Sequence, residues 1–316
     1  MNARRRWGRW ALLAAMVMAG LSFGALWLSD RLILDERDTS AEPSPGPLAD
    51  AVARGEYLTR VGGCFSCHTL PGGEQLAGGR ALATPFGTFY SPNLTPDVET
   101  GIGGWTDAQF VRALRKGIRP DGSDYFPVFP YPSFTNITTS DALAIKAYLF
   151  SRPAVHRPNR AHDVAFPFSW RFLQSGWRLL FFKPGPFRSS LNESIAYNRG
   201  AYLVTALSHC SECHTPRNAL GAMRRGLWLA GNADGPDGQV VPNITPDPAT
   251  GIGGWQKSDL IELLKTGATP EQTTVKGAMR EAIADGLKDL SDDDRAAIAD
   301  YLLAQPPIVH EITQRR

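Results

Sequence analysis

Cysteine is scarce in this sequence, with four residues in a chain of 316. That number is too small for a disulfide-stabilised scaffold of this length. An excess of charge of one sign is also missing, because the formal net charge is +2. This argues against a nucleic-acid-binding chain, which normally carries a basic stripe. The hydrophobic fraction of 43% and the charged fraction of 20% exclude a disordered chain and a protein with many membrane spans.

Long hydrophobic runs are absent except for one near the N-terminus. Residues 10–28 contain no charge, and a helix of that length measures about 28 Å, close to the ~30 Å hydrocarbon core of a bilayer. A basic cluster precedes the run: Arg4, Arg5, Arg6 and Arg9. This flank predicts a cytoplasmic N-terminus and a transmembrane anchor over residues 1–34, with the rest exported. A cleaved signal peptide is the alternative, although its apolar core is usually only ~7–15 residues long.

An internal repeat organises the rest of the chain. Each copy is roughly a hundred residues long, near the size of a small domain. The copies share the motifs 54–58 with 199–203, 93–97 with 243–247, and 101–105 with 251–255. The repeat predicts this division: 1–34 anchor, 35–49 flexible linker, 50–155 first domain, 156–198 connector, 199–308 second domain and 309–316 tail.

Helical spacing of apolar residues recurs in both copies, and no stretch alternates in the manner of a strand. The predicted helices cover residues 49–61, 106–116 and 140–150 in the first copy, and 195–207, 257–266 and 291–303 in the second. The sequence therefore predicts an all-α fold, with two tandem domains preceded by the transmembrane helix.

The connector is rich in aromatic and basic residues. Its aromatic residues are Phe166, Phe168, Trp170, Phe172, Trp177, Phe181, Phe182 and Phe187. Because exposed aromatic side chains favour aggregation, we expect them to pack onto both domains. A membrane-facing or partner-facing surface is the alternative interpretation.

Two Cys-x-x-Cys-His motifs, at 64–68 and 210–214, are the signature of covalent haem attachment. Cysteines three residues apart can each form a thioether with one haem vinyl group, and the histidine that follows can then bind the iron. A zinc site would need further Cys or His ligands, and a thioredoxin-like pair would need a βαβ context. The predicted attachment residues are Cys64, Cys67, Cys210 and Cys213, and the predicted axial ligands are His68 and His214.

The sixth iron ligand distinguishes the two copies. Met279 lies between the second motif and the last predicted helix, and its thioether is the expected distal ligand of the second haem. The repeat offset of 150 aligns it with Phe129, which cannot bind iron. The first haem is therefore expected to be five-coordinate or to use another side chain, with His162 as a candidate.

Several further motifs make the sequence resemble the cytochrome c subunits of bacterial membrane-bound alcohol dehydrogenases and gluconate 2-dehydrogenases. These motifs are Gly-Gly-Arg at 78–80, TPFGT at 84–88, FPF at 166–168, NRGAYL at 198–203 and CHTPRN at 213–218. The family commonly carries a third haem domain, and this chain has no third motif. The family motif Pro-Ala-Met-Pro-Tyr reads Pro-Val-Phe-Pro-Tyr at 127–131.

The resemblance implies a dihaem cytochrome c with two covalently bound haem c groups, anchored in the inner membrane with its haem domains in the periplasm. It would take electrons from a periplasmic or membrane-bound dehydrogenase. It would pass them to a quinone, an oxidase or another cytochrome of the respiratory chain. The alternative is a dihaem oxidoreductase, peroxidase-like or acting on sulphur anions, with haem 1 as an open catalytic site. An electron-transfer subunit is expected rather than an independent enzyme, because no acid–base constellation accompanies the first motif.

Overall fold

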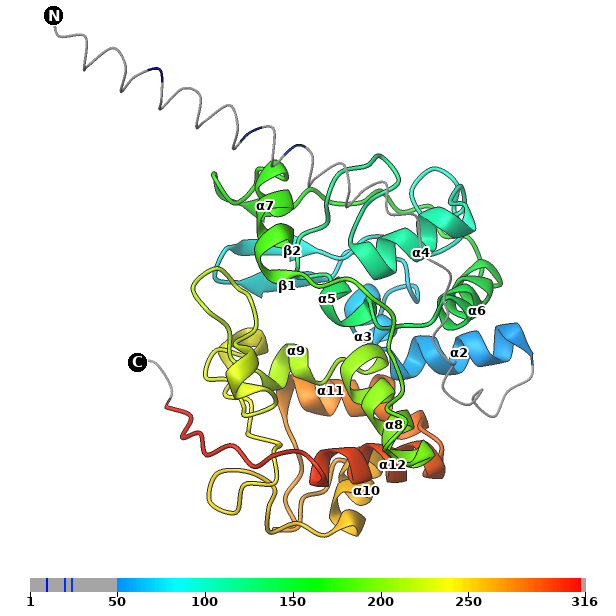
Figure 1. Ribbon diagram of the computed structural model, residues 1–316. Helices are drawn as coiled ribbons and strands as arrows, with labels where there is room; N and C mark the ends of the chain where they lie inside the picture. Colours follow the sequence, from blue (N-terminus) through cyan, green and yellow to red (C-terminus); the bar gives the residue numbers. More distant parts are fainter. Residues whose placement is uncertain (1–9, 11–19, 21–23, 25–49, 314–316) are drawn as a thin grey trace, which may run out of the picture. The chain divides into compact units, whose positions relative to one another are not determined.

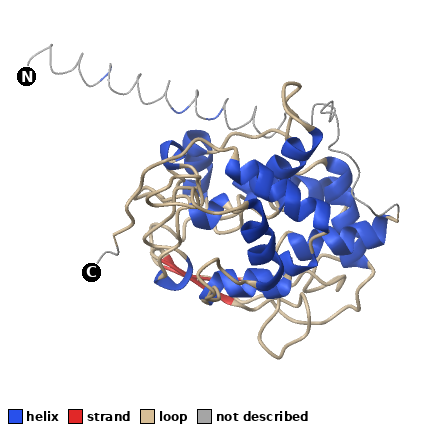
Figure 2. Cartoon of the chain, turned by 90° about the horizontal axis from the view of Figure 1, so that it is seen from below, coloured by secondary structure: helices blue, strands red, loops and turns tan. Residues whose placement is uncertain are grey.

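The computed structural model describes residues 10, 20, 24 and 50–313. The chain divides into two units, Met1–Thr39 and Ser40–Arg316, and the fold described here is that of the second. Helices and loops make up most of it, with a small sheet (Figures 1 and 2).

The first repeat and the connector contain these elements: α2 (Ala51–Val61), α3 (Cys64–His68), β1 (Ala81–Thr84), β2 (Gly87–Tyr90), α4 (Asp107–Lys116), α5 (Tyr131–Phe134), α6 (Thr139–Phe150), β3 (Asp163–Val164) and α7 (Phe172–Phe181). The second repeat contains α8 (Ile195–Tyr202), the π-helix η1 (Leu203–Leu207), α9 (Ser211–His214), the 3₁₀ turns η2 (Arg225–Leu227) and η3 (Pro236–Gly238), α10 (Lys257–Thr266), α11 (Gly277–Asp285), the 3₁₀ turn η4 (Leu287–Asp289) and α12 (Asp292–Leu303). The six helices predicted from apolar spacing are confirmed, with starts that differ by at most two residues.

Local capping explains where several of these helices begin and end. Thr106 and Gln109 form a reciprocal capping box at the start of α4, and Gly117 ends that helix in the left-handed conformation. Ser291 caps α12 by accepting a hydrogen bond from the Asp294 amide. These capping contacts are made between residues close in the sequence, so they explain the helix boundaries locally.

Each repeat is built on a close pair of helices, α2 with α6 and α8 with α12 (Figure 1). Glycine makes the close approach possible at both crossings. A Cβ atom at Gly55 would lie 1.9 Å from the carbonyl oxygen of Ala144, and one at Gly200 would lie 1.9 Å from that of Ala297. Any side chain at these two positions would force the helices apart.

Two equivalent hydrogen bonds join the repeats, one donated by each repeat to the other. The Tyr202 hydroxyl of α8 donates to Asp141 of α6 at 2.5 Å, and the Tyr57 hydroxyl of α2 donates to Asp294 of α12 at 2.5 Å. Burial is the main cause that raises the pKa of both phenols, so each remains a donor. The same aspartates are paired within their own repeats, with Arg54 and Arg199 respectively.

The prediction of an all-α fold was wrong, because β1, β2 and β3 form a three-stranded antiparallel sheet. Thr84 pairs with Gly87 across a two-residue hairpin turn, and Gly87 has a φ of 130° that disfavours a side chain. A Cβ at Gly87 would also lie 2.4 Å from the Asp163 carbonyl oxygen of β3. Strands of four and two residues are too short to show a clear alternation in the sequence.

The predicted N-terminal transmembrane helix is the second correction. No helix in the described residues is long and apolar enough to cross a membrane. The predicted span, residues 10–28, lies outside the described part of the chain except for Trp10, Gly20 and Gly24.

The connector packs on both repeats with only some of its aromatic residues. Phe182 contacts Tyr131 of the first repeat, with ring centroids 5.1 Å apart, and Phe187 contacts Tyr202 of the second at 5.6 Å. Phe168 remains partly exposed, but its ring contacts Phe86 of the first repeat at 5.1 Å. The expectation was wrong for three further aromatic side chains, which are exposed: Phe166, Trp170 and Phe172.

Candidate functional site

Each Cys-x-x-Cys-His motif forms one helical turn: α3 contains the whole first motif, and in the second motif Cys210 is the N-cap of α9. Cysteines at positions i and i+3 of a helix share one face, so both thiols of a pair are available to one planar ligand. A residue with positive φ starts each turn, Gly63 at 68° and His209 at 38°. All four cysteines are half-buried free thiols.

Burial keeps the histidines of the two motifs neutral. It lowers the pKa of His68 to about 4 and also lowers the pKa of His214. The Nδ1 atoms lie 2.8 Å from the carbonyl oxygens of Pro92 and Pro242. Because a carbonyl only accepts, Nδ1 carries the proton and Nε2 keeps its lone pair. This is the tautomer required of an imidazole that binds a metal through Nε2.

The loop after each motif is held in the same way in both repeats. The amide of Gly78 donates to the carbonyl oxygen of His68 at 2.7 Å, and the amide of Gly231 donates to that of His214 at 2.7 Å. Leu76 and Leu229 are fully buried with φ values of 62° and 60°. A leucine in this conformation is strained, and apolar spacing does not reveal it, so sequence reasoning missed these two residues.

The loop that carries Met279 has a counterpart in the first repeat with the offset of 150 used above. The Tyr125 amide donates to Gly117 at 2.8 Å, and the Val275 amide donates to Gly267 at 3.0 Å. Four residues further on, the paths differ. Met279 lies in the first turn of α11, whereas Phe129 lies in a turn before α5. Both side chains are partly buried against the core.

His162 lies among aromatic residues of the first repeat. Its Nδ1 accepts a hydrogen bond from the Tyr90 amide at 3.2 Å, and its ring lies 5.2 Å from Phe89 and 5.6 Å from Phe126. Burial, followed by Arg171 and Arg119, lowers its pKa. The imidazole is therefore neutral, and because Nδ1 accepts, its proton lies on Nε2. This is not the tautomer found for His68 and His214, so ligation of iron through Nε2 would require the contact with the Tyr90 amide to break.

The segments that lead into the two motifs touch each other. The Nε2 of His209 lies 3.3 Å from the carbonyl oxygen of Gly62. Burial first, and then Glu212, raises the pKa of the Cys213 thiol to about 11, and the thiol of Cys67 in the other motif adds to that rise.

Each motif is also contacted by a helix of the other repeat. At the first motif, Arg80 donates to the Ser66 carbonyl oxygen at 2.6 Å and to Glu281 of α11 at 2.7 Å. At the second, the hydroxyl of Ser133 on α5 donates to Glu212 at 2.6 Å. The second repeat therefore helps to build the first site, and the first repeat helps to build the second.

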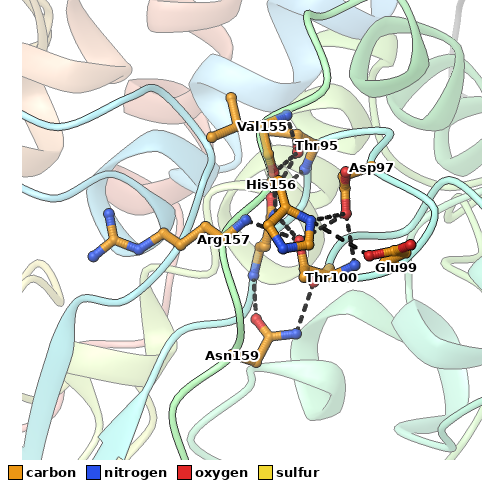
Figure 3. Close-up of polar contacts among 9 residues, drawn as sticks. Thr95, Asp97, Glu99, Thr100, Val155, His156, Arg157 and Asn159 are labelled. Carbon is orange, nitrogen blue, oxygen red and sulfur yellow. Dashed lines mark hydrogen bonds and ion pairs between the residues drawn. The ribbon is translucent and has the colours of Figure 1, made fainter.

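The Asn-x-Thr-Pro-Asp motif holds the chain that leaves the last helix of each repeat. In the first repeat the Asn93 amide group donates to the Val155 carbonyl oxygen at 2.8 Å. The Arg157 amide donates to Thr100 at 2.9 Å, and His156 lies 3.7 Å from both Asp97 and Glu99 (Figure 3). In the second repeat, Asn243 donates in the same way to Ile308 at 2.8 Å. This shared motif is structural.

The donor set fits a covalently attached porphyrin. Each site offers two thiols on one helical face and a neutral imidazole beside them, and apolar side chains bury the site. Within residues that the structure describes, no group of three or more His, Cys, Asp or Glu side chains could hold a bare metal ion.

Comparison with known proteins gives several similar chains. A protein of Cereibacter sphaeroides named "Diheme cytochrome c-type" is 40% identical, over 94% of this chain and 97% of its own length. "Alcohol dehydrogenase (quinone), cytochrome c subunit" of Gluconobacter oxydans is 36% identical over 95% of this chain. "Gluconate 2-dehydrogenase cytochrome c subunit" of Pantoea cypripedii is 36% identical over 92% of it.

The dehydrogenase subunits are longer than this chain. The match spans 60% of the Gluconobacter subunit and 64% of the Pantoea subunit. No protein-family model matches the sequence.

Proposed function

This chain belongs to the family of dihaem c-type cytochromes and dehydrogenase cytochrome c subunits, and from that premise we propose that it relays electrons from a periplasmic dehydrogenase to the respiratory chain. It carries two covalently bound haem c groups and serves in electron transfer. The donor is a dehydrogenase acting on a small alcohol or sugar acid, as the names of the relatives suggest. The acceptor is a quinone, an oxidase or another cytochrome.

The chain's own residues hold the two haems and set their environment. Cys64 and Cys67 attach haem 1, and Cys210 and Cys213 attach haem 2. His68 and His214 bind the iron through Nε2, and the Nδ1 contacts with Pro92 and Pro242 support this role because they fix the tautomer and the orientation of each ring. The haems supply reversible one-electron chemistry.

Met279 is the proposed distal ligand of haem 2. Met279 and Glu281 are two residues apart on α11, and at about 100° per residue they point to opposite sides of the helix. Glu281 contacts Arg80 at the first motif. The sulphur of Met279 is therefore directed away from the first motif, which supports an assignment to haem 2.

The observation that carries the relay is the contact between His209 and Gly62. Each of these residues precedes its own Cys motif by one or two positions. The attachment points are consequently on neighbouring turns, which favours rapid electron exchange between the haems without a diffusing carrier.

The relay is tested in cells that lack this chain. Oxygen uptake with one alcohol or sugar acid should be lost, while the same cells still reduce an artificial dye with that substrate, because the dehydrogenase itself remains. Wild-type chain should restore the uptake, and the Cys210→Ala/Cys213→Ala variant should not. The measurement is repeated with a set of alcohols and sugar acids. Oxygen uptake that is unchanged with every one of them would overturn the proposal.

Phe129 favours a second candidate function, a dihaem oxidoreductase in which haem 1 offers an open iron position. Phe129 corresponds to Met279 in the sequence repeat, and a phenyl ring cannot bind iron. A reduced protein that binds carbon monoxide at one haem supports this candidate. Two low-spin haems and no carbon monoxide binding exclude it and support a further ligand such as His162.

A further inference from the structure

The helix α7 has its polar side turned inward and its apolar side turned to solvent. Its buried residues are Gln174, Ser175 and Arg178, whose exposed fractions are 9%, 7% and 4%. On the opposite side, Leu173, Leu179 and Leu180 are 39%, 40% and 73% exposed. At about 100° per residue, these leucines and Phe172 fall within one arc of roughly 120°. This is the reverse of an ordinary surface helix.

Buried contacts fix α7 in this orientation. Arg178 forms an ion pair at 2.6 Å with Asp124, which is 2% exposed, and Ser175 donates a hydrogen bond to the same carboxylate. Arg171, before the first turn, donates to the Asp124 carbonyl oxygen at 2.9 Å. Rolling the helix to bury its leucines would separate a buried charge pair, which is strongly unfavourable. The outward apolar face is therefore a stable feature of the fold.

The apolar surface continues along the segment before the helix. Phe166, Phe168 and Trp170 are 79%, 43% and 55% exposed. Figure 1 places α7 at the end of the unit away from α10 and α12. The two segments meet where the ring of Trp170 lies 5.6 Å from that of Phe172. Exposed aromatic and aliphatic side chains in this number mark an interaction surface, because their contact with water is unfavourable.

Charge and shape favour a lipid surface as the occupant. Residues 164–192 contain no Asp or Glu, and the exposed Lys183 and Arg188 lie just beyond the helix. Asp121, a carboxylate near Arg171, is paired with Arg119 at 3.4 Å. Basic side chains beside Trp, Phe and Leu are typical of helices that lie in the bilayer interface and attract anionic headgroups. A helix of ten residues is about 15 Å long, so it can lie along a membrane and cannot span it.

We propose that the apolar face of α7 and the Phe166–Trp170 segment lie in the surface of a bilayer that contains anionic lipid. Leu173, Leu179 and Leu180 enter the acyl boundary, Trp170 lies at the headgroup level, and Lys183 contacts lipid phosphate. This surface would hold the haem-bearing unit against the membrane. The proposal stands on the geometry of α7 and does not depend on the identity of the electron donor or acceptor.

A spin label at the centre of this face tests the proposal in the full-length, haem-loaded protein. The variant Leu180→Cys offers a free thiol for a nitroxide, and Val98→Cys is the matched control, since Val98 is 75% exposed and lies outside the connector. On addition of phosphatidylethanolamine/phosphatidylglycerol vesicles, collisions of the label at position 180 with oxygen should rise several-fold relative to those with a water-soluble nickel chelate. The label at position 98 should not change. The readout is local, so it does not depend on what else attaches the chain to the vesicle.

A second variant tests whether the apolar side chains of Leu179 and Leu180 are needed for contact with the bilayer. Leu179→Glu/Leu180→Glu, made in the Trp170→Cys background with the label at position 170, should return the collision ratio to its value without vesicles. Since all of these side chains are exposed, the fold should survive. An unchanged ratio at position 180 overturns the proposal. Two other results also overturn it, because a protein would then cover the face. In one, the label is shielded from the nickel chelate without lipid as the protein concentration rises. In the other, it is shielded only when a dehydrogenase is added.

Discussion

The Nε2 of His209 lies 3.3 Å from the carbonyl oxygen of Gly62, and this contact joins the segments that precede the two Cys motifs. His209 has a φ of 38°, a conformation that its non-glycine side chain disfavours. The ring also packs edge-on against Phe134, at a centroid distance of 5.3 Å. The backbone strain at this position is thus offset by contacts that hold the two sites together.

Removing one pair of cysteines should halve the haem content. The Cys64→Ala/Cys67→Ala variant and the Cys210→Ala/Cys213→Ala variant should each retain one haem per chain, because each site has its own attachment thiols. Haem content is measured by pyridine haemochrome absorbance and by the mass of the intact chain. Acid–acetone extraction should leave the remaining haem bound. Two haems retained in either variant would contradict the assignment of the cysteines.

Met279→Ala should remove the ferric sulphur-to-iron absorption band and lower the reduction potential of one haem, because thioether ligation favours ferrous iron. The matched control is Met223→Ala, which lies in a loop after the second motif and should leave the band and both potentials unchanged. Spectra and a redox titration follow the two variants. A band that is lost with Met223 and kept with Met279 would reverse the ligand assignment.

Gly55→Ala should destabilise the protein by about 2 kcal/mol or more, since a Cβ at this position would lie 1.9 Å from the Ala144 carbonyl oxygen and force α2 and α6 apart. Gly104→Ala is the control, because a Cβ there meets no atom within 4 Å. Denaturant titration of both variants measures the free energy of unfolding. Equal stability of the two would show that the helix pair adjusts without cost.

Tyr57→Phe should lower the free energy of unfolding by about 1–3 kcal/mol, because the buried carboxylate of Asp294 loses a hydrogen-bond donor. Tyr197→Phe, whose hydroxyl makes only a 3.4 Å contact with Gln305, should change it by less than about 1 kcal/mol. Thermal unfolding followed by haem absorbance is a suitable measurement. A smaller effect at Tyr57 than at Tyr197 would show that the contact between the repeats contributes little.

The sequence predicted the helices and the attachment motifs because both are local patterns. Spacing of apolar residues marks α4 and α10, and the spacing of Cys64, Cys67 and His68 is itself the chemical signature. The hairpin of β1 and β2 was missed because its strands are four residues long. The Tyr57–Asp294 contact joins residues 237 positions apart, and no local pattern encodes a partner at that distance.

The sequence also did not predict which side of α7 faces solvent. The aromatic residues of the connector were expected to be buried against the domains, and this expectation is correct for Phe182 and wrong for Phe172. The orientation depends on Asp124, which lies in another segment and binds Arg178. The direction in which an amphipathic helix faces is therefore decided by where its polar partner lies.

The exchanged pairs Tyr57–Asp294 and Tyr202–Asp141 repeat one contact with the roles of the two repeats reversed. This is the pattern of an isologous interface in a two-fold symmetric dimer, with both halves in one chain. Each repeat carries a donor and an acceptor, so either repeat on its own presents a self-complementary surface. The covalent connection makes the pairing intramolecular, and dilution cannot separate the two redox centres.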